Sequence, residues 1–132
     1  MTLRVSVVVP TFKRPALLER CLNALLSQDF APRDYEVIVV DDADCDETRL
    51  QVEWRAKCAK ECGHTMRYIP ITGISRSHGP AAARNIGWRA AYGEIIAFTD
   101  DDCIPVSSWL TEGYAAFVDG VAAVSGRIIV PR

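Results

Sequence analysis

The sequence predicts an α/β domain in which a mostly parallel sheet is flanked by helices. Two observations carry this prediction. Four short segments are apolar throughout rather than alternating, which is typical of strands buried on both faces of a parallel sheet. Segments with helical spacing or helix-start signals separate these strands along the chain. The 132 residues, 49% of them hydrophobic, suffice for one domain around a single core.

The first strand is predicted at residues 5–9, "VSVVV", because short β-branched runs favour strands; Pro10 is expected to end it. A helix follows, since Pro15 suits a first helical turn. Its buried face is predicted from apolar residues at helical spacing, namely Leu18, Cys21, Leu22 and Leu25.

The second strand is predicted at residues 35–40, "YEVIVV", and a helix from about residue 47 to residue 60. Residues 65–71 form a weaker third strand. Pro70 within it argues for an edge position or a strand end, because proline cannot donate to a sheet ladder.

A glycine-bearing loop at residues 72–80 leads to a helix that Pro80 can start and Gly93 can cap. The fourth strand is predicted at residues 94–98, "EIIAF". We then expect a helix started by Ser107 or Ser108 and running to Val118. Residues 121–130 are predicted to close the chain as one or two strands.

Polar residues follow each strand, and in open α/β sheets ligands bind beyond the carboxyl ends of the strands. We therefore expect four polar groups to meet at one edge of the sheet. They are Pro10–Thr11–Phe12–Lys13–Arg14, then Asp41–Asp42, then the loop before Arg84, and finally Asp100–Asp101–Asp102.

Three consecutive aspartates follow the fourth strand, and like charges in contact repel one another and cost stability. They are therefore either a solvated turn or a site for a positive partner. The first strand is followed by neither of the glycine-rich phosphate loops, G-x-G-x-x-G or G-x-x-x-x-G-K-[ST]. A divalent cation held by carboxylates and by the phosphates of a ligand is another route to phosphate binding.

Asp41 and Asp42 have two possible roles. Their carboxylates can accept hydrogen bonds from a nucleobase or a ribose, or they can solvate a loop or cap the next helix. Arg84, near the start of its helix, can bind phosphate with its guanidinium or be an ordinary surface arginine. His78 is interpreted as a solvated loop residue, with a phosphate contact as the alternative.

Composition excludes several classes of function. The 17 acidic and 15 basic residues nearly cancel, so there is no strongly basic nucleic-acid surface. No apolar run approaches the length of a membrane span. The five cysteines are interpreted as reduced thiols. A zinc site at Cys58, Cys62 and His64 is disfavoured, because the spacing matches no common pattern and a fourth ligand is not evident.

Four stretches, in this order, resemble the nucleotide-sugar-binding part of a family 2 glycosyltransferase with the GT-A fold. They are "SVVVPTFKRPALLERCLNALLSQ", "YEVIVVDDADCDET", "GPAAARNIGWRAAYGEIIAFTDDDCIP" and "VSGRIIVP". The resemblance covers essentially residues 1–132 and implies a Rossmann-like GT-A half domain. Its partner would be a nucleoside diphosphate sugar, most often a UDP-sugar, and its cofactor Mn²⁺ or Mg²⁺.

The resemblance also implies roles for individual residues. The metal ligands would be Asp102, as the principal one, and Asp100, with Asp101 as a helper. The transfer would be inverting, with a carboxylate base that deprotonates an acceptor hydroxyl. The nucleotide-binding residues would be Pro10, Thr11, Phe12, Arg14, Asp41, Asp42, Arg84, Asp100 and Asp101.

This sequence departs from the family pattern in two ways. We expect the acceptor-binding part and the catalytic base to be absent from residues 1–132, and no residue is assigned as the base. The loop "DDADCDET" also lacks the usual glycine-serine turn.

Three interpretations therefore remain. The chain could be a donor-binding domain that transfers slowly or not at all alone, or a non-catalytic module of this kind. It could be an enzyme completed by a partner chain or by self-association across an exposed sheet edge. It could instead be a phosphoacceptor receiver domain, although receivers place paired acids after the first strand. We expect the protein to be located in the cytoplasm, where a partner could hold it at the cytoplasmic face of a membrane.

Overall fold

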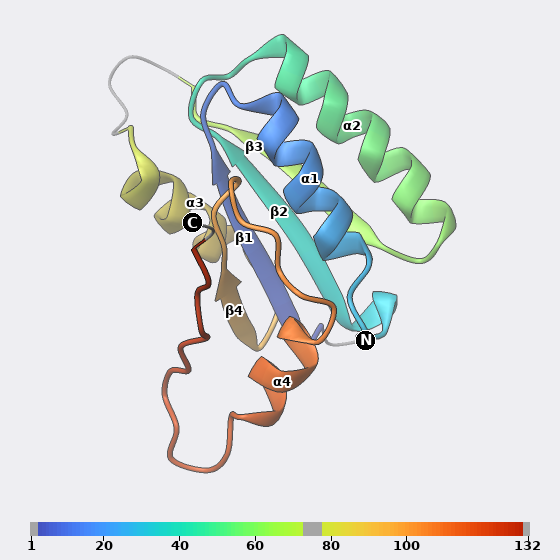
Figure 1. The fold of residues 1–132 in the computed structure, drawn as a ribbon. Helices are drawn as coiled ribbons and strands as arrows, with labels where there is room; N and C mark the ends of the chain where they lie inside the picture. Colours follow the sequence, from blue (N-terminus) through green and yellow to red (C-terminus); the bar gives the residue numbers. More distant parts are fainter. Residues whose placement is uncertain (1–2, 73–77, 131–132) are drawn as a thin grey trace.

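A computed structural model describes residues 3–72 and 78–130, and it contains one four-stranded sheet with helices on both faces (Figure 1). The strands are β1 (Val5–Thr11), β2 (Tyr35–Asp41), β3 (Thr65–Pro70) and β4 (Ile95–Phe98). The helices are α1 (Pro15–Leu26), α2 (Asp46–Glu61), α3 (Pro80–Ala90) and α4 (Trp109–Ala115), with a 3-10 turn at Pro32–Asp34. The predicted α/β class is confirmed.

All neighbouring strands are parallel, in the order β3-β2-β1-β4. The two central strands are buried at every position, which explains why their sequences are apolar throughout. The prediction that residues 65–71 form an edge strand is confirmed, since β3 pairs only with β2 and ends at Pro70.

The side chains of the sheet alternate between two cores. Val5, Val7 and Val9 pack with α1, α2 and α4, and the α1 residues predicted from helical spacing are all buried there. Val8 faces the other way, toward Ala83 of α3. Three helices therefore cover one face of the sheet, and α3 covers the other (Figure 1).

Helix α3 lies unusually close to β1 because Gly87 has no side chain. A Cβ atom placed at Gly87 would lie 2.3 Å from Cγ1 of Val8. Gly93 was predicted to cap this helix, but α3 ends at Ala90. Gly93 instead allows the chain to pass the start of β1, where an added Cβ would lie 2.5 Å from the Ser6 nitrogen.

Three further predictions need correction. Strand β1 runs through Pro10 to Thr11, because β4 pairs with β1 only as far as Val8 and the proline lies beyond that ladder. Helix α4 stops at Ala115 rather than Val118. Residues 121–130 form no strand: they are exposed and have no hydrogen-bonded neighbour strand, which a strand requires.

The predicted loop at residues 72–80 lies partly outside the described residues. None of the helices in the described ranges is long and apolar enough to cross a membrane.

Candidate functional site

A cleft of about 180 Å³ opens at the carboxyl ends of β1, β2 and β4, beside the start of α3. The expected convergence of polar groups at this edge is therefore observed. The cleft is lined by Pro10, Thr11, Phe12, Arg14, Asp42, Gly79, Pro80, Ala83, Arg84, Asp100 and Asp102. Of the residues predicted for the site, only Asp41 and Asp101 do not line it.

Asp100 and Asp102, in the turn after β4, are exposed to the cleft, and Cys103 follows them. Ligand atoms of these three residues all lie within 4.8 Å of one another, and they form the one such group in the described part of the chain. Two carboxylates suit a hard divalent cation such as Mn²⁺ or Mg²⁺, whereas the thiol of Cys103 is too soft to prefer one. The donor set thus fits the predicted cofactor through Asp100 and Asp102.

Asp101, between them, points the other way and is fully buried. Its Oδ2 accepts hydrogen bonds from the Thr11 hydroxyl at 2.9 Å and from Nε of Arg14 at 3.1 Å. Its Oδ1 lies 2.8 Å from Nη2 of Arg14 as an ion pair without an aligned hydrogen bond. Burial raises the pKa of Asp101, and the Thr11 hydrogen bond and the Arg14 charge act against this increase.

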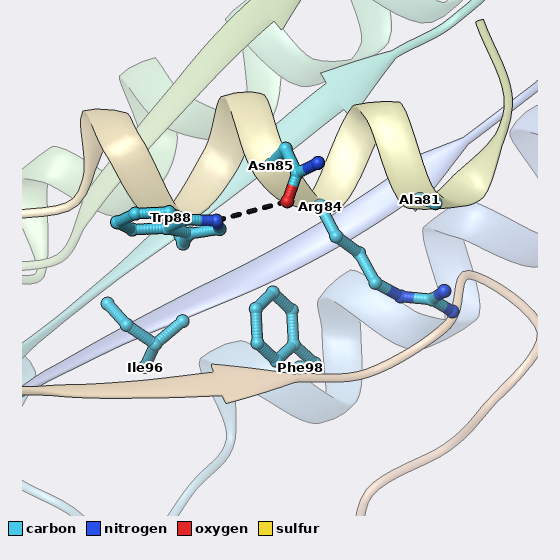
Figure 2. Close-up of a pocket in the computed structure, with 6 residues that line it drawn as sticks. All are labelled: Ala81, Arg84, Asn85, Trp88, Ile96 and Phe98. Carbon is cyan, nitrogen blue, oxygen red and sulfur yellow. Dashed lines mark hydrogen bonds between the residues drawn. The ribbon is translucent and has the colours of Figure 1, made fainter.

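Arg84 reaches from α3 to the acidic turn, where its Nη2 donates to Oδ1 of Asp100 over 2.8 Å. Both side chains are partly exposed in the cleft. Figure 2 shows Arg84 extending from the helix toward the segment that follows β4. In this structure the arginine therefore supplies positive charge beside one of the two candidate metal ligands.

Asp42 binds the segment that begins α3. Its Oδ2 accepts from the Gly79 N–H at 2.8 Å, and its Oδ1 lies 2.6 Å from Nδ1 of His78. Gly79 has a φ of 105°, in the region that favours glycine. The carboxylate caps this helix rather than the helix that directly follows it in sequence, and His78 is paired with it rather than only solvated.

Asp41 is fully buried and holds the loop after β2. Its Oδ1 accepts from the N–H of Ala43 at 3.0 Å, and its Oδ2 from the N–H of Cys45 at 2.9 Å. The hydroxyl of Tyr68 also donates to Oδ2, at 2.5 Å. Burial, followed by the bond to Asp41, raises the pKa of Tyr68. Sequence analysis missed Tyr68, since only the β2–β3 register brings it near the end of β2.

A second, larger groove of about 520 Å³ lies between α3 and β4 and shares Arg84 with the cleft. Figure 2 shows its lining residues, Ala81, Arg84, Asn85, Trp88, Ile96 and Phe98. The indole N–H of Trp88 donates to Oδ1 of Asn85 over 3.2 Å. Trp88 and Phe98 give the groove an exposed aromatic lining.

The family model described as Glycosyl transferase family 2 matches residues 6–132. The chain therefore belongs to glycosyltransferase family 2, and its parallel sheet flanked by helices is the GT-A arrangement. Glycosyltransferase AglE of Haloferax volcanii is 33% identical over 125 residues, which is 94% of this chain and 39% of AglE. The receiver-domain alternative is thereby overturned.

Two solved structures are similar to the chain. S. aureus TarS 1-349 in complex with UDP-GlcNAc has a TM-score of 0.71 at 29% identity, over 86% of this chain and 30% of TarS. Mannosyltransferase PcManGT from Pyrobaculum calidifontis, in complex with GDP-Man and Mn2+, has a TM-score of 0.73 at 31% identity. The match covers 89% of this chain and 33% of PcManGT. The chain thus spans less than half the length of these relatives.

Proposed function

We propose that the cleft is the donor site of a glycosyl transfer reaction and binds a nucleoside diphosphate sugar, preferably a UDP-sugar, with Mn²⁺ or Mg²⁺. The observation that carries the proposal is that two exposed carboxylates, Asp100 and Asp102, line the cleft together with Arg84, which forms an ion pair with Asp100. Two relatives solved with UDP-GlcNAc and with GDP-Man and Mn2+ support it.

The apolar residues of the cleft suit the nucleoside. Pro10 and Phe12 are apolar, and the Phe12 ring is half exposed, so a base can stack against it. Lys13, with a φ of 52°, places its ammonium 5.3 Å from the centre of that ring. Asp42 lies within reach as an acceptor, whereas a contact of Asp41 with the base would require the loop that it holds to open.

Asp100, Asp102 and Arg84 suit the diphosphate. A cation bound to Asp100 and Asp102 would neutralise negative charge that develops on the leaving diphosphate. Arg84 can exchange its bond with Asp100 for one with a phosphate oxygen, because its planar guanidinium matches both groups. The start of α3 adds the positive end of a helix dipole.

We propose an inverting transfer in which a carboxylate deprotonates the acceptor hydroxyl and the oxygen attacks the anomeric carbon from the side opposite the diphosphate. Among the described residues, each carboxylate that lines the cleft already has a role, either in binding the donor or in holding the fold. We therefore place the base and the acceptor pocket outside residues 1–132, in a region corresponding to the unmatched part of the relatives.

The test is thermal unfolding of the protein with UDP, GDP and TDP, each with and without Mn²⁺. A ligand at 100 times its Kd stabilises the folded state by about 2.7 kcal/mol. This raises the midpoint by roughly 2–8 °C per kcal/mol. We expect the largest shift with UDP and Mn²⁺ together. If no nucleotide shifts the midpoint in either condition, the donor-site proposal is wrong.

A further inference from the structure

The central aspartate of the acidic turn has no access to the cleft, although its two neighbours do. Three carboxylates in a row repel one another, and the fold removes one of them from this repulsion. Asp101 turns inward, where Arg14 offsets its charge at 2.8 Å. Asp100 and Asp102 remain exposed and would hold a cation.

The contacts of Asp101 tie the turn to two other elements. Thr11 is the last residue of β1, and Arg14 immediately precedes α1. A further contact comes from Cys21 of α1, whose thiol donates to the carbonyl oxygen of Asp100 over 3.5 Å. Within the turn, the N–H of Cys103 donates to that same carbonyl over 3.1 Å. The side chain of Asp101 thus connects the turn after β4 to β1 and to the start of α1.

We infer that Asp101 is a positioning residue rather than a metal ligand: Thr11 and Arg14 hold its carboxylate inside the fold, so that Asp100 and Asp102 face the cleft. This assignment deepens the proposed donor site and rests on it. It replaces the helper role that the resemblance implied for Asp101. It also gives Arg14 a task at the site that needs no contact with the nucleotide.

A matched control exists at the opposite end of the sheet. Glu36 is buried like Asp101, accepts from a hydroxyl, that of Ser6, at 2.7 Å, and pairs with an arginine, Arg67, at 3.0 Å. Glu36→Gln removes a buried charge of the same kind, far along the strand from the cleft. It reports what loss of a buried ion pair does to the fold alone.

The experiment compares Asp101→Asn with Glu36→Gln and the parent protein by two measurements. The first is amide hydrogen exchange of Cys103 without any ligand, which reports the order of the turn. The second is the ratio of UDP affinities with and without Mn²⁺. For Asp101→Asn we expect faster exchange at Cys103 and a fall of roughly tenfold or more in that ratio, as for groups that orient metal ligands. Glu36→Gln should leave both unchanged.

The two proposals fail in different ways. If Asp101→Asn keeps the exchange rate of Cys103 and the Mn²⁺ dependence of the parent, the positioning role is overturned and the donor site stands. If the parent itself binds UDP no better with Mn²⁺, the metal-dependent donor site fails, and the exchange rate alone decides whether Asp101 orders the turn.

Should Asp101→Asn fail to fold, Thr11→Val removes one donor to Asp101 and nearly keeps the shape. It should lower the Mn²⁺ dependence in the same direction. A loss of UDP affinity that is equal with and without Mn²⁺ would instead show that Thr11 acts directly on the nucleotide, against the positioning role.

Discussion

Arg84 and Asp100 form an ion pair across the cleft, with Nη2 of the arginine 2.8 Å from Oδ1 of the aspartate. The pair joins α3 to the turn after β4. A cation that binds Asp100 must share this carboxylate with the guanidinium, which carries a charge of the same sign. If the proposed donor site is correct, Arg84 should therefore oppose binding of the cation alone and favour binding of the cation together with the phosphates.

Replacing Arg84 should change two affinities in opposite directions. In Arg84→Gln we expect Mn²⁺ alone to bind several-fold more tightly, because a neighbouring positive charge is gone. Mn²⁺ with UDP should bind several-fold more weakly, because a phosphate partner is lost. Electron paramagnetic resonance titration of Mn²⁺ with and without UDP measures both. Arg89→Gln, on the exposed side of the same helix, is the control; changes of the same sign in both titrations would contradict the assignment.

Asp102 is expected to be the principal metal ligand. Asp102→Asn should abolish the Mn²⁺-dependent part of UDP binding and leave the unfolding midpoint without ligand unchanged, since the side chain is exposed. Isothermal titration with UDP at increasing Mn²⁺ checks this. Asp119→Asn, an exposed aspartate in the loop after α4, serves as the control. Unchanged affinity in the Asp102 variant would remove this residue from the metal site.

Asp41 is predicted to serve the nucleoside, and the structure adds a role in the fold. Asp41→Ala should weaken uridine even without metal. It should also destabilise the protein by about 1–3 kcal/mol, because the N–H groups of Ala43 and Cys45 lose their acceptor. Tyr68→Phe is the comparison, since it removes one donor to the same carboxylate but keeps the carboxylate. Equal uridine affinity for Asp41→Ala and the parent would contradict the prediction.

The cysteines should differ sharply in reactivity. Burial raises the pKa of the Cys21 thiol to about 12, so hardly any thiolate forms there at pH 7–9. Cys58 and Cys62 are exposed. We expect iodoacetamide to label Cys58 and Cys62 in the native protein, and Cys21 only after unfolding. Peptide mass spectrometry after timed quenching measures this, and labelling of native Cys21 at the rate of Cys58 would be inconsistent with the described fold.

The strands and the polar edge of the sheet could be predicted because they depend on local sequence. A run such as 35–40 has few alternatives to a buried strand, and the residue after it must lie at the edge of the sheet. The direction of each aspartate could not be predicted. Asp101 turns inward because Thr11 and Arg14, about 90 residues earlier in the sequence, donate hydrogen bonds to its carboxylate.

Other features depended on partners that sequence periodicity does not reveal. Residues 121–130 carry strand-forming side chains but lack a neighbour strand among the described residues. Gly93 carries the signal of a helix cap, yet its position is explained by contact with Ser6. Asp41 accepts a hydrogen bond from Tyr68 on the adjacent strand, and only the register of the sheet brings the two residues together.

Gly87 lies outside the lining of the cleft, but it allows α3, which carries Arg84, to pack closely on the sheet. It lies one turn after Arg84 on α3, and its missing side chain lets the helix rest directly on Val8. A methyl group at this position would clash with Val8, so either the valine or the helix that carries Arg84 would have to shift. The distance between Arg84 and Asp100 thus depends on Gly87, a residue that has no side chain with which to contact a ligand.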